Sequence, residues 1–301
     1  MRVTVVHNEK AGCGFLSREE LLGELEYAGH EVTEVTHLDL LLTPAFRESC
    51  EVVIAAGGDG TILSVARRLL NSELPMVVLP LGTANNLAQT LGVTRDLKTL
   101  IASLTRPRLR SLDLGRAVGS WGVKYFCESA GVGWFCEALS EAIAEGDKTP
   151  SRARDVLTNF LGKYEARHWD LAIDGHNFSG DYVMIDVMNA GMLGPNLHLG
   201  RSADPSDGAF DVVLATPEDR PKLLEYMEAL RRDETPTAPE LHVKRARHVR
   251  FSMGDRKLRV DGKLRHPSAF VDIHVVPSAV KVLLPALVEH PVRPELASVA
   301  A

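Results

Sequence analysis

The chain has 301 residues, of which 45% are hydrophobic and 25% charged, so it has enough apolar material for two domains or one large one. The net charge of −6 argues against a dedicated nucleic-acid-binding protein, which would carry a basic excess. No stretch of 18 apolar residues is present, so we expect no membrane-spanning segment.

The first 115 residues alternate between strand-like and helix-like patterns. We expect strands at 2–7, 30–36, 51–56 and 75–81, and helices at 17–28, 62–70, 87–91 and 97–104. Ser17 is the expected N-cap of the first helix, with Glu20 completing a capping box. Short apolar strands that alternate with helices predict a Rossmann-like, doubly wound parallel sheet.

The pattern becomes strand-rich after residue 115. We expect strands at 125–130, 169–173, 182–188, 209–214, 248–251, 257–260 and 270–275, and helices at 136–144, 153–164 and 222–231. This pattern predicts an antiparallel, sandwich-like second domain over 116–278. Residues 279–290 are expected to return to the first domain, and 291–301 to form a tail.

The four cysteines, Cys13, Cys50, Cys127 and Cys136, form no Cys-x-x-Cys pair, so the usual spacing of zinc ligands is absent. Reduced thiols and the lack of a signal-peptide pattern predict a cytoplasmic protein.

A first candidate site lies where the strand over 51–56 runs into Gly57-Gly58-Asp59-Gly60-Thr61 and a helix follows. Glycines allow the backbone to approach an oxyanion closely, and a helix N-terminus offers unpaired N–H groups. The pattern therefore predicts a phosphate-binding loop. Asp59 suits Mg²⁺ binding or general-base activation of a hydroxyl group.

A second turn of the same kind follows the strand over 75–81, with Gly82, Thr83, Asn85 and Asn86. Two successive strand-to-helix turns place two helix N-termini at the carboxyl edge of one sheet, where doubly wound folds bind ligands. These side chains are candidates for contacts to phosphate, metal-bound water or substrate. Capping by Thr83 with solvated asparagines is the plain structural alternative.

Six segments in order resemble the diacylglycerol kinase catalytic-domain family, which includes sphingosine and ceramide kinases and bacterial lipid kinases. They are GGDGT (57–61), LPLGTANNLA (79–88), SLDLGR (111–116), FCESAGVGWFCEA (126–138), the segment 189–215, and LRVDGKLRH (258–266). The resemblance covers nearly the whole chain. It implies ATP-dependent phosphorylation of a lipid hydroxyl, such as that of a diacylglycerol, ceramide or sphingosine, in a cleft between the two domains.

The resemblance also assigns roles to residues. Gly57, Gly58, Gly60 and Thr61 would hold the ATP phosphates, and the nucleotide would also contact Asn8, Gly82, Thr83, Asn85, Asn86 and Lys263. Asp59 and Asp113 would be catalytic and would hold a catalytic Mg²⁺, and Asp207 would belong to a structural Mg²⁺ site.

This sequence departs from the family pattern at two positions. The second signature often ends Asn-Asp, but here it is Asn85-Asn86, and Asp261-Gly262-Lys263 stands where Asp-Gly-Glu is usual. Loss of two acids predicts weaker metal binding, a shifted substrate preference or lost catalysis. Lys263 is either a phosphate-binding residue or the solvated tip of a hairpin.

Other residues leave two interpretations open. Trp134 and Phe135 are either core residues or part of an acyl-chain pocket. The basic residues between Lys244 and Arg250 are either a solvated strand face or a contact to phospholipid head groups.

We therefore expect a cytoplasmic lipid kinase that uses ATP and Mg²⁺ and meets its lipid by transient contact with the inner membrane face, with no nucleic-acid partner and with a homodimer left open. An NAD kinase-like enzyme is the first alternative, because that family shares the GGDG loop. The second is a nucleotide- or lipid-binding protein without kinase activity, because Asn86 and Lys263 replace acids.

Overall fold

The computed structural model describes residues 1–12, 16–34, 43–93, 96–145 and 149–285. Cys13, residues 286–290 of the return predicted over 279–290, and the tail predicted over 291–301 lie outside the described residues. No helix in the described part of the chain is long and apolar enough to cross a membrane.

The first domain is a parallel sheet with strand order β2-β1-β3-β4. Its strands are β1 (Arg2–His7), β2 (Glu31–Glu34), β3 (Val52–Gly57) and β4 (Met76–Pro80). Its helices are α1 (Arg18–Tyr27), α2 (Pro44–Ser49), α3 (Asp59–Arg68), α4 (Asn86–Thr90) and α5 (Leu97–Ser103). Ser17 and Glu20 form the predicted capping box of α1. The Rossmann-like prediction is confirmed.

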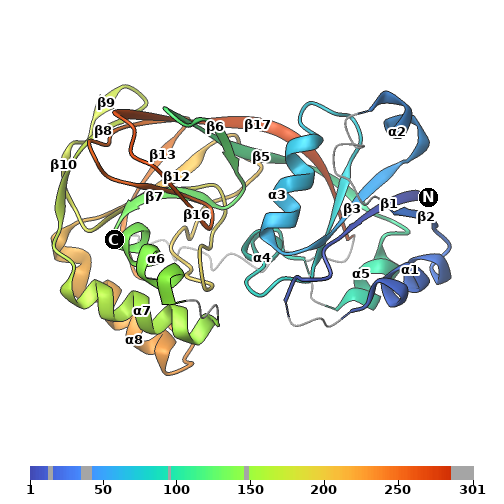
Figure 1. Cartoon of the computed structure of the whole chain (residues 1–301), viewed down its shortest axis with the longest axis horizontal. Coiled ribbons are helices and arrows are strands. Elements are labelled where there is room, and N and C mark those ends of the chain that lie inside the picture. The colour runs from blue at the N-terminus through green and yellow to red at the C-terminus, as the bar shows by residue number, and fades with distance from the viewer. Residues whose placement is uncertain (13–15, 35–42, 94–95, 146–148, 286–301) are drawn as a thin grey trace, which may run out of the picture.

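The second domain contains most of the strands (Figure 1). They are β5 (Arg108–Gly119), β6 (Gly122–Phe126), β7 (Ser129–Gly133), β8 (Arg167–Ile173), β9 (His176–Asn177), β10 (Gly180–Tyr182), β11 (Met184–Met188), β12 (Phe210–Ala215), β13 (His242–Ala246), β14 (His248–Ser252), β15 (Leu258–Val260), β16 (Lys263–Arg265) and β17 (Phe270–Leu284). The helices are α6 (Trp134–Glu145), α7 (Pro150–Lys163), the 3₁₀ turn η2 (Pro217–Asp219) and α8 (Arg220–Arg231).

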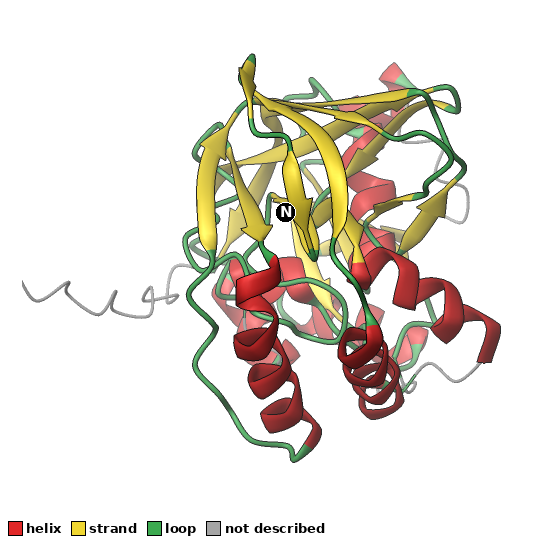
Figure 2. Ribbon diagram, turned by 90° about the vertical axis from the view of Figure 1, so that its left-hand side faces the viewer, coloured by secondary structure: helices red, strands yellow, loops and turns green. Residues whose placement is uncertain are grey.

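These strands form two sheets that pack face to face, which confirms the predicted sandwich. The six-stranded sheet has the order β13-β12-β11-β7-β15-β16. Its strands alternate between two cores: Ile185 and Val187 of β11 face the other sheet, whereas Met184 and Met188 face the layer of α6, α7 and α8. In Figure 2 strands cover most of the upper part of the molecule, and most of the helices lie in the lower part.

The second sheet continues into the first domain, and two long strands cause this continuity. β5 pairs antiparallel with β17 along almost its whole length, and Val282 of β17 pairs in parallel with Met76 of β4. One eleven-stranded sheet therefore spans both domains (Figure 1). The boundaries expected at residues 115 and 278 both fall inside these two strands.

A bulge interrupts the β5–β17 ladder between Val276 and Val280. Ser278 lies in this bulge with a φ of 50°. Its N–H donates to Asp113 Oδ1 at 2.7 Å, so a side chain of β5 stabilises the irregular backbone of β17.

The sequence patterns missed several features of the fold, among them the strands β9, β13 and β16. The strand expected at 125–130 is divided between β6 and β7, with Cys127 and Glu128 at the break. β5 was not predicted, although the alternation of polar and apolar residues at its start is itself typical of a strand. The short helix α2 was also missed.

The two glycine-bearing turns of the first domain touch each other. An added Cβ atom at Gly82 would lie 2.4 Å from the Cα of Gly58. Glycine is therefore required at position 82 by this close approach, because real Cβ atoms do not come so near to backbone atoms.

We expect Gly82→Ala to destabilise the protein by about 1–3 kcal/mol, because the methyl group forces the two turns apart. Gly60→Ala is the matched control, since nothing lies within 4 Å of a Cβ at that position. Thermal unfolding followed by circular dichroism should show a lowered Tm for Gly82→Ala alone. Equal Tm values for the two variants would contradict the contact.

Candidate active site

A polar pocket of about 760 Å³ opens at the carboxyl ends of β1 and β3. It is lined by Val6, His7, Asn8, Ala11, Gly12, Glu34, Gly58, Gly60, Thr61, Ser64, Gly82 and Lys263. The N-terminus of α3 therefore faces the pocket, and its N–H groups and dipole favour an anion there. This placement brings together six of the residues predicted to contact nucleotide, namely Asn8, Gly58, Gly60, Thr61, Gly82 and Lys263.

Two polar side chains complete the pocket from other parts of the chain. Asn8 follows β1, and its Nδ2 donates to Thr61 Oγ1 at 3.2 Å. Lys263 comes from the second domain, at the start of β16, and is exposed. The cation therefore stands at the mouth of an anion-favouring pocket rather than on a hairpin tip remote from it.

Asn85 has its side chain turned into its own loop. It adopts a left-handed backbone conformation with φ 53°. Its Oδ1 accepts the N–H of Gly82 at 2.9 Å, and its Nδ2 donates to the carbonyl of Gly82 at 2.7 Å. Asn85 thus holds Gly82 in place, and its predicted contact to nucleotide remains a prediction.

Asn86 is buried at the start of α4 and faces the second domain. Its Nδ2 donates to Glu128 Oε2 at 2.7 Å and to the carbonyl of Gly194 at 3.0 Å. Its Oδ1 accepts from Asn196 Nδ2 at 3.1 Å. The side chain is a hydrogen-bonded link between the domains. Its predicted role in nucleotide binding also remains untested.

Asp59 lies next to this link. Its Oδ1 accepts the N–H of Leu87 at 3.1 Å, which ties the first turn of α3 to α4. Burial raises the pKa of Asp59, and backbone N–H groups of Leu87 and its neighbours oppose the rise. A carboxylate with a raised pKa, held at a helix N-terminus, is suited to take a proton from a hydroxyl group.

Two further carboxylates, Glu128 and Asp261, lie close to Asp59. Burial, followed by the charges of Asp59 and Asp261, raises the pKa of Glu128 well above its ordinary value. Asp261 accepts N–H groups from Cys127, Glu128 and Ser129 at 3.0–3.2 Å. It therefore holds the break between β6 and β7 and fixes the backbone of Glu128.

Arg259 is the one arginine or lysine that is buried among the described residues. Its guanidinium group forms a two-fold contact with Asp186 at 2.6 and 2.7 Å and donates to the carbonyl of Asp261 at 3.0 Å. Since Asp186 already pairs with this cation, Arg259 offsets the charges of Asp59, Glu128 and Asp261 only in part, and the pKa values of all three carboxyl groups are raised.

The structure places Asp113 in a different set of contacts. Its two carboxylate oxygens accept the N–H groups of Gly208 and Ser278, both at 2.7 Å. Burial raises its pKa, and the charges of Asp207 and Asp204 add to the rise. These contacts join β5, the loop before β12 and the bulge of β17; a catalytic or metal-binding role for Asp113 remains a prediction.

Asp207, predicted to bind a structural Mg²⁺, forms an ion pair with Arg245 at 2.8 Å. Its Oδ1 also accepts the N–H of Ala209 at 3.0 Å. Its predicted metal role is likewise untested.

An apolar pocket of about 220 Å³ lies on the other side of the second turn. It is lined by Thr83, Ala84, Phe135, Leu139, Pro150, Ala153, Leu157, Gly194 and Pro195. Thr83 therefore faces this pocket. Trp134 and Phe135 are both buried, and Phe135 also forms part of the pocket wall.

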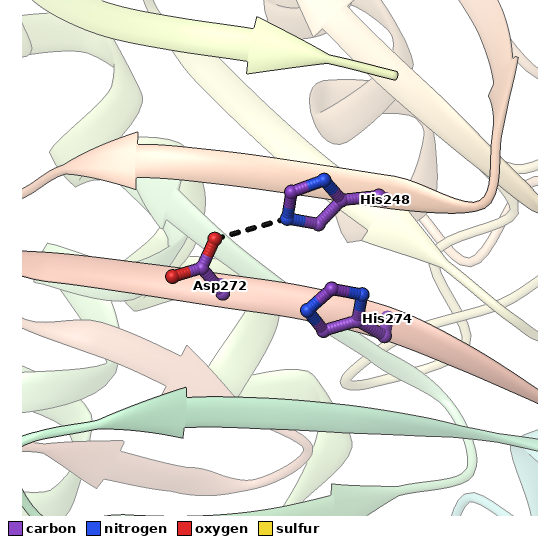
Figure 3. Close-up of side chains that lie close together, drawn as sticks. All are labelled: His248, Asp272 and His274. Carbon is purple, nitrogen blue, oxygen red and sulfur yellow. Dashed lines mark hydrogen bonds and ion pairs between the residues drawn. The ribbon is translucent and has the colours of Figure 1, made fainter. Parts of the chain in front are cut away.

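A separate group of potential metal ligands lies on the large sheet (Figure 3). His248 Nε2 and Asp272 Oδ1 are 2.9 Å apart, and the rings of His248 and His274 stack with centroids 4.2 Å apart. Arg250 lies 3.7 Å from Asp272, and the charge of Arg116 helps to lower the pKa of His274, after burial and the charge of His248. Positive charge on two sides makes this a cross-strand ion pair with a stacked imidazole rather than a cation site.

Comparisons with known proteins agree with this architecture. Residues 2–117 match the diacylglycerol kinase catalytic domain, and residues 152–284 match the YegS C-terminal NAD kinase beta sandwich-like domain. The chain is 26% identical over 297 residues to a diacylglycerol kinase of Mycobacterium tuberculosis, covering 94% of this chain and 95% of the relative. It is also 26% identical to a diacylglycerol kinase of Bacillus subtilis, covering 91% and 96%.

The first domain, residues 2–117, belongs to the diacylglycerol kinase catalytic-domain family. Solved structures share its fold at low identity. A diacylglycerol kinase from Bacillus anthracis superposes with a TM-score of 0.69 and 17% identity, covering 96% of this chain and 98% of the other. An NAD kinase from Archaeoglobus fulgidus, solved in complex with ATP, superposes with a TM-score of 0.51 and 14% identity, covering 95% and 94%.

Membership in a kinase family raises the question of whether the site fits Mg²⁺. Carboxylate oxygens are the donors that this ion prefers, and it is usually held by one or two of them together with substrate phosphates. Asp59 and Glu128 offer such oxygens, and a bound cation would favour the ionised forms of both carboxyl groups. Among the described residues, no three carboxylates here converge within 4.8 Å, so the protein would supply only part of the coordination.

Two acidic residues of this site escaped the sequence analysis. Glu128 was hidden within a segment interpreted as one apolar strand, although an acid in such a run is itself a signal of a buried polar site. This signal points to Glu128, but it does not show that Asn86 is the hydrogen-bond partner of Glu128. Asp261 was not predicted as a site residue, because the departure from the family pattern in this segment lies at Lys263.

The carboxyl group of Asp261 predicts a pH-dependent stability. Burial raises its pKa to about 6 from 3.8. The folded protein therefore holds this proton more tightly than the unfolded chain, and the free energy of unfolding falls as the pH rises from about 4 to about 6. Asp261→Asn removes this titration, so wild type should lose stability relative to the variant as the pH increases.

Urea unfolding of both proteins at pH 4.5 and pH 7 measures this difference, with Asp255→Asn at an exposed position as the matched control. A difference between wild type and Asp261→Asn that is the same at both pH values would contradict the prediction.

Proposed function

We propose that the protein is an ATP-dependent lipid kinase that transfers the γ-phosphate to a lipid hydroxyl group. The observation that carries the proposal is the shared wall of two unlike pockets. Gly82 lines the polar pocket, and the next two residues, Thr83 and Ala84, line the apolar one. A phosphate donor and an apolar acceptor bound in these pockets would meet at one turn.

The polar pocket supports binding of the nucleotide phosphates. It combines the N-terminus of α3, the glycines of the GGDGT segment and the Lys263 side chain. The family relatives are named diacylglycerol kinases, and the NAD kinase of similar fold was solved with ATP. These observations favour ATP as the donor.

The apolar pocket supports a lipid acceptor. Phe135, Leu139, Pro150, Ala153 and Leu157 give it an apolar wall from α6 and α7. A pocket of this composition suits the portion of an acyl chain near the head group. Contact with a membrane surface would then be transient and would serve to load the lipid.

Asp59 is the residue best placed to act on the acceptor. It begins α3 between Gly58 and Gly60, which both line the polar pocket, and its contact with Leu87 fixes it against the second turn. Its raised pKa favours acceptance of the hydroxyl proton as the phosphoryl group is transferred in line. Mg²⁺ bound with ATP would neutralise phosphate charge, and Asp59 with Glu128 would hold it.

The assay that tests this function compares acceptors with ATP as donor. We expect phosphate transfer to diacylglycerol, ceramide or sphingosine in mixed micelles, and none to NAD. Asp59→Asn should lower kcat at least about 100-fold, while asparagine still accepts the N–H of Leu87 and preserves the fold. Transfer to NAD alone would establish the NAD kinase-like alternative, and ATP binding without transfer would establish a binding protein.

The apolar pocket makes a separate prediction about chain length. Ala153→Trp should fill the pocket and raise the KM for a long-chain lipid about 10-fold or more, since several buried methylene groups lose their contacts. The KM for ATP should not change. Ser151→Trp, on the exposed side of α7, is the matched control. If Ala153→Trp leaves the lipid KM unchanged, the acyl chain binds elsewhere.

A further inference from the structure

Glu128 is a buried acid whose position needs an explanation. It comes from the second domain, at the break between β6 and β7, and is 8% exposed. Asp261 fixes its backbone by accepting the N–H groups of residues 127–129. Its side chain reaches across to the first domain and accepts from Asn86. Such a carboxylate is costly without a cation, and buried Arg259 is already paired with Asp186.

Asn86 is the matching group on the other side. Its amide nitrogen donates to Glu128, and its carbonyl oxygen accepts from Asn196, so the orientation of the amide is fixed by donors and acceptors. The following residue, Leu87, donates its N–H to Asp59. Glu128 and Asp59 therefore contact two consecutive residues of α4, Asn86 and Leu87.

We propose that Asn86 and Glu128 form a matched amide–acid pair in which Glu128 supplies, from the second domain, the carboxyl group beside Asp59 that the family signature more often carries at position 86. The proposal rests on the proposed kinase function. Glu128 is then a positioning residue that also helps to hold Mg²⁺ with the nucleotide, and the acid at this site has moved from one domain to the other.

The geometry explains why an acid at position 86 would not suit this chain. The substitution Asn86→Asp would place two carboxylates at the 2.7 Å contact that now joins an amide to the acid of Glu128. Like charges at such a distance in a buried site repel strongly. A carboxyl group can therefore stand at position 86 or at position 128, but not at both.

The test is a double-mutant cycle with Asn86→Asp, Glu128→Gln and the double variant. Asn86→Asp should lower the Tm by about 5 °C or more and reduce turnover, because it creates the carboxylate pair. Glu128→Gln should keep a Tm near that of wild type, because its amide oxygen still accepts from Asn86. It should, however, raise the Mg²⁺ concentration for half-maximal turnover about 10-fold.

The double variant should recover the Mg²⁺ requirement to within a few-fold of wild type, because its glutamine amide can donate to the new carboxylate at position 86. Its Tm should rise clearly above that of Asn86→Asp but stay below that of wild type, because the carbonyl of Gly194 still loses its donor. Glu165→Gln, an exposed glutamate, is the matched control and should behave as wild type in every assay.

Binding of Mg²⁺ with ADP, measured by isothermal titration calorimetry, gives a readout that does not depend on turnover. Weaker Mg²⁺-dependent ADP binding by Glu128→Gln and its recovery in the double variant would support the proposal. Wild-type binding by Glu128→Gln, or a double variant no better than Asn86→Asp, would overturn it. If wild type phosphorylates no lipid, the proposed function fails, while the Tm cycle and ADP binding still decide the role of the pair.

Discussion

The close approach of Gly58 and Gly82 is the constraint on which the site depends. These two residues lie in the turns that follow successive strands of one parallel sheet, and the turns are in backbone contact. The contact puts the beginnings of α3 and α4 side by side, so that Asp59 of one helix accepts the N–H of Leu87 in the other. A larger residue at either turn would separate the pocket for an anion from the neighbouring apolar pocket. A phosphate donor and an apolar acceptor bound in these pockets would then lie further apart.

The second domain adds to this framework the groups that the first domain lacks. Lys263 brings a positive charge to the polar pocket, and Glu128 brings a carboxyl group to Asn86. Asp261 and Arg259, two residues apart on one hairpin, hold the strand break from which Glu128 projects. The acidic part of the site is therefore assembled across the domain boundary by hydrogen bonds whose geometry is fixed on both sides.

Much of this arrangement could be predicted from the sequence, because local patterns encode strand-to-helix turns. The strands that precede Gly57 and Gly82, the capping box at Ser17 and the sandwich of the second domain were all expected from periodicity. Glu128 could not be placed, since its strand break depends on Asp261, more than 130 residues away. The inward orientation of Asn85 likewise depends on a left-handed backbone conformation that the neighbouring residues do not predict.

The shared ladder of β5 and β17 has a consequence for biosynthesis. The core of the first domain includes Val280, Val282 and Leu284, which are near the end of the described chain. Val282 also pairs with Met76, so the parallel sheet gains its last neighbour only when β17 is present. A ribosome-bound chain lacking these residues would leave an apolar edge of β4 open, and the N-terminal domain would depend on chaperones or on the remaining translation to complete its core.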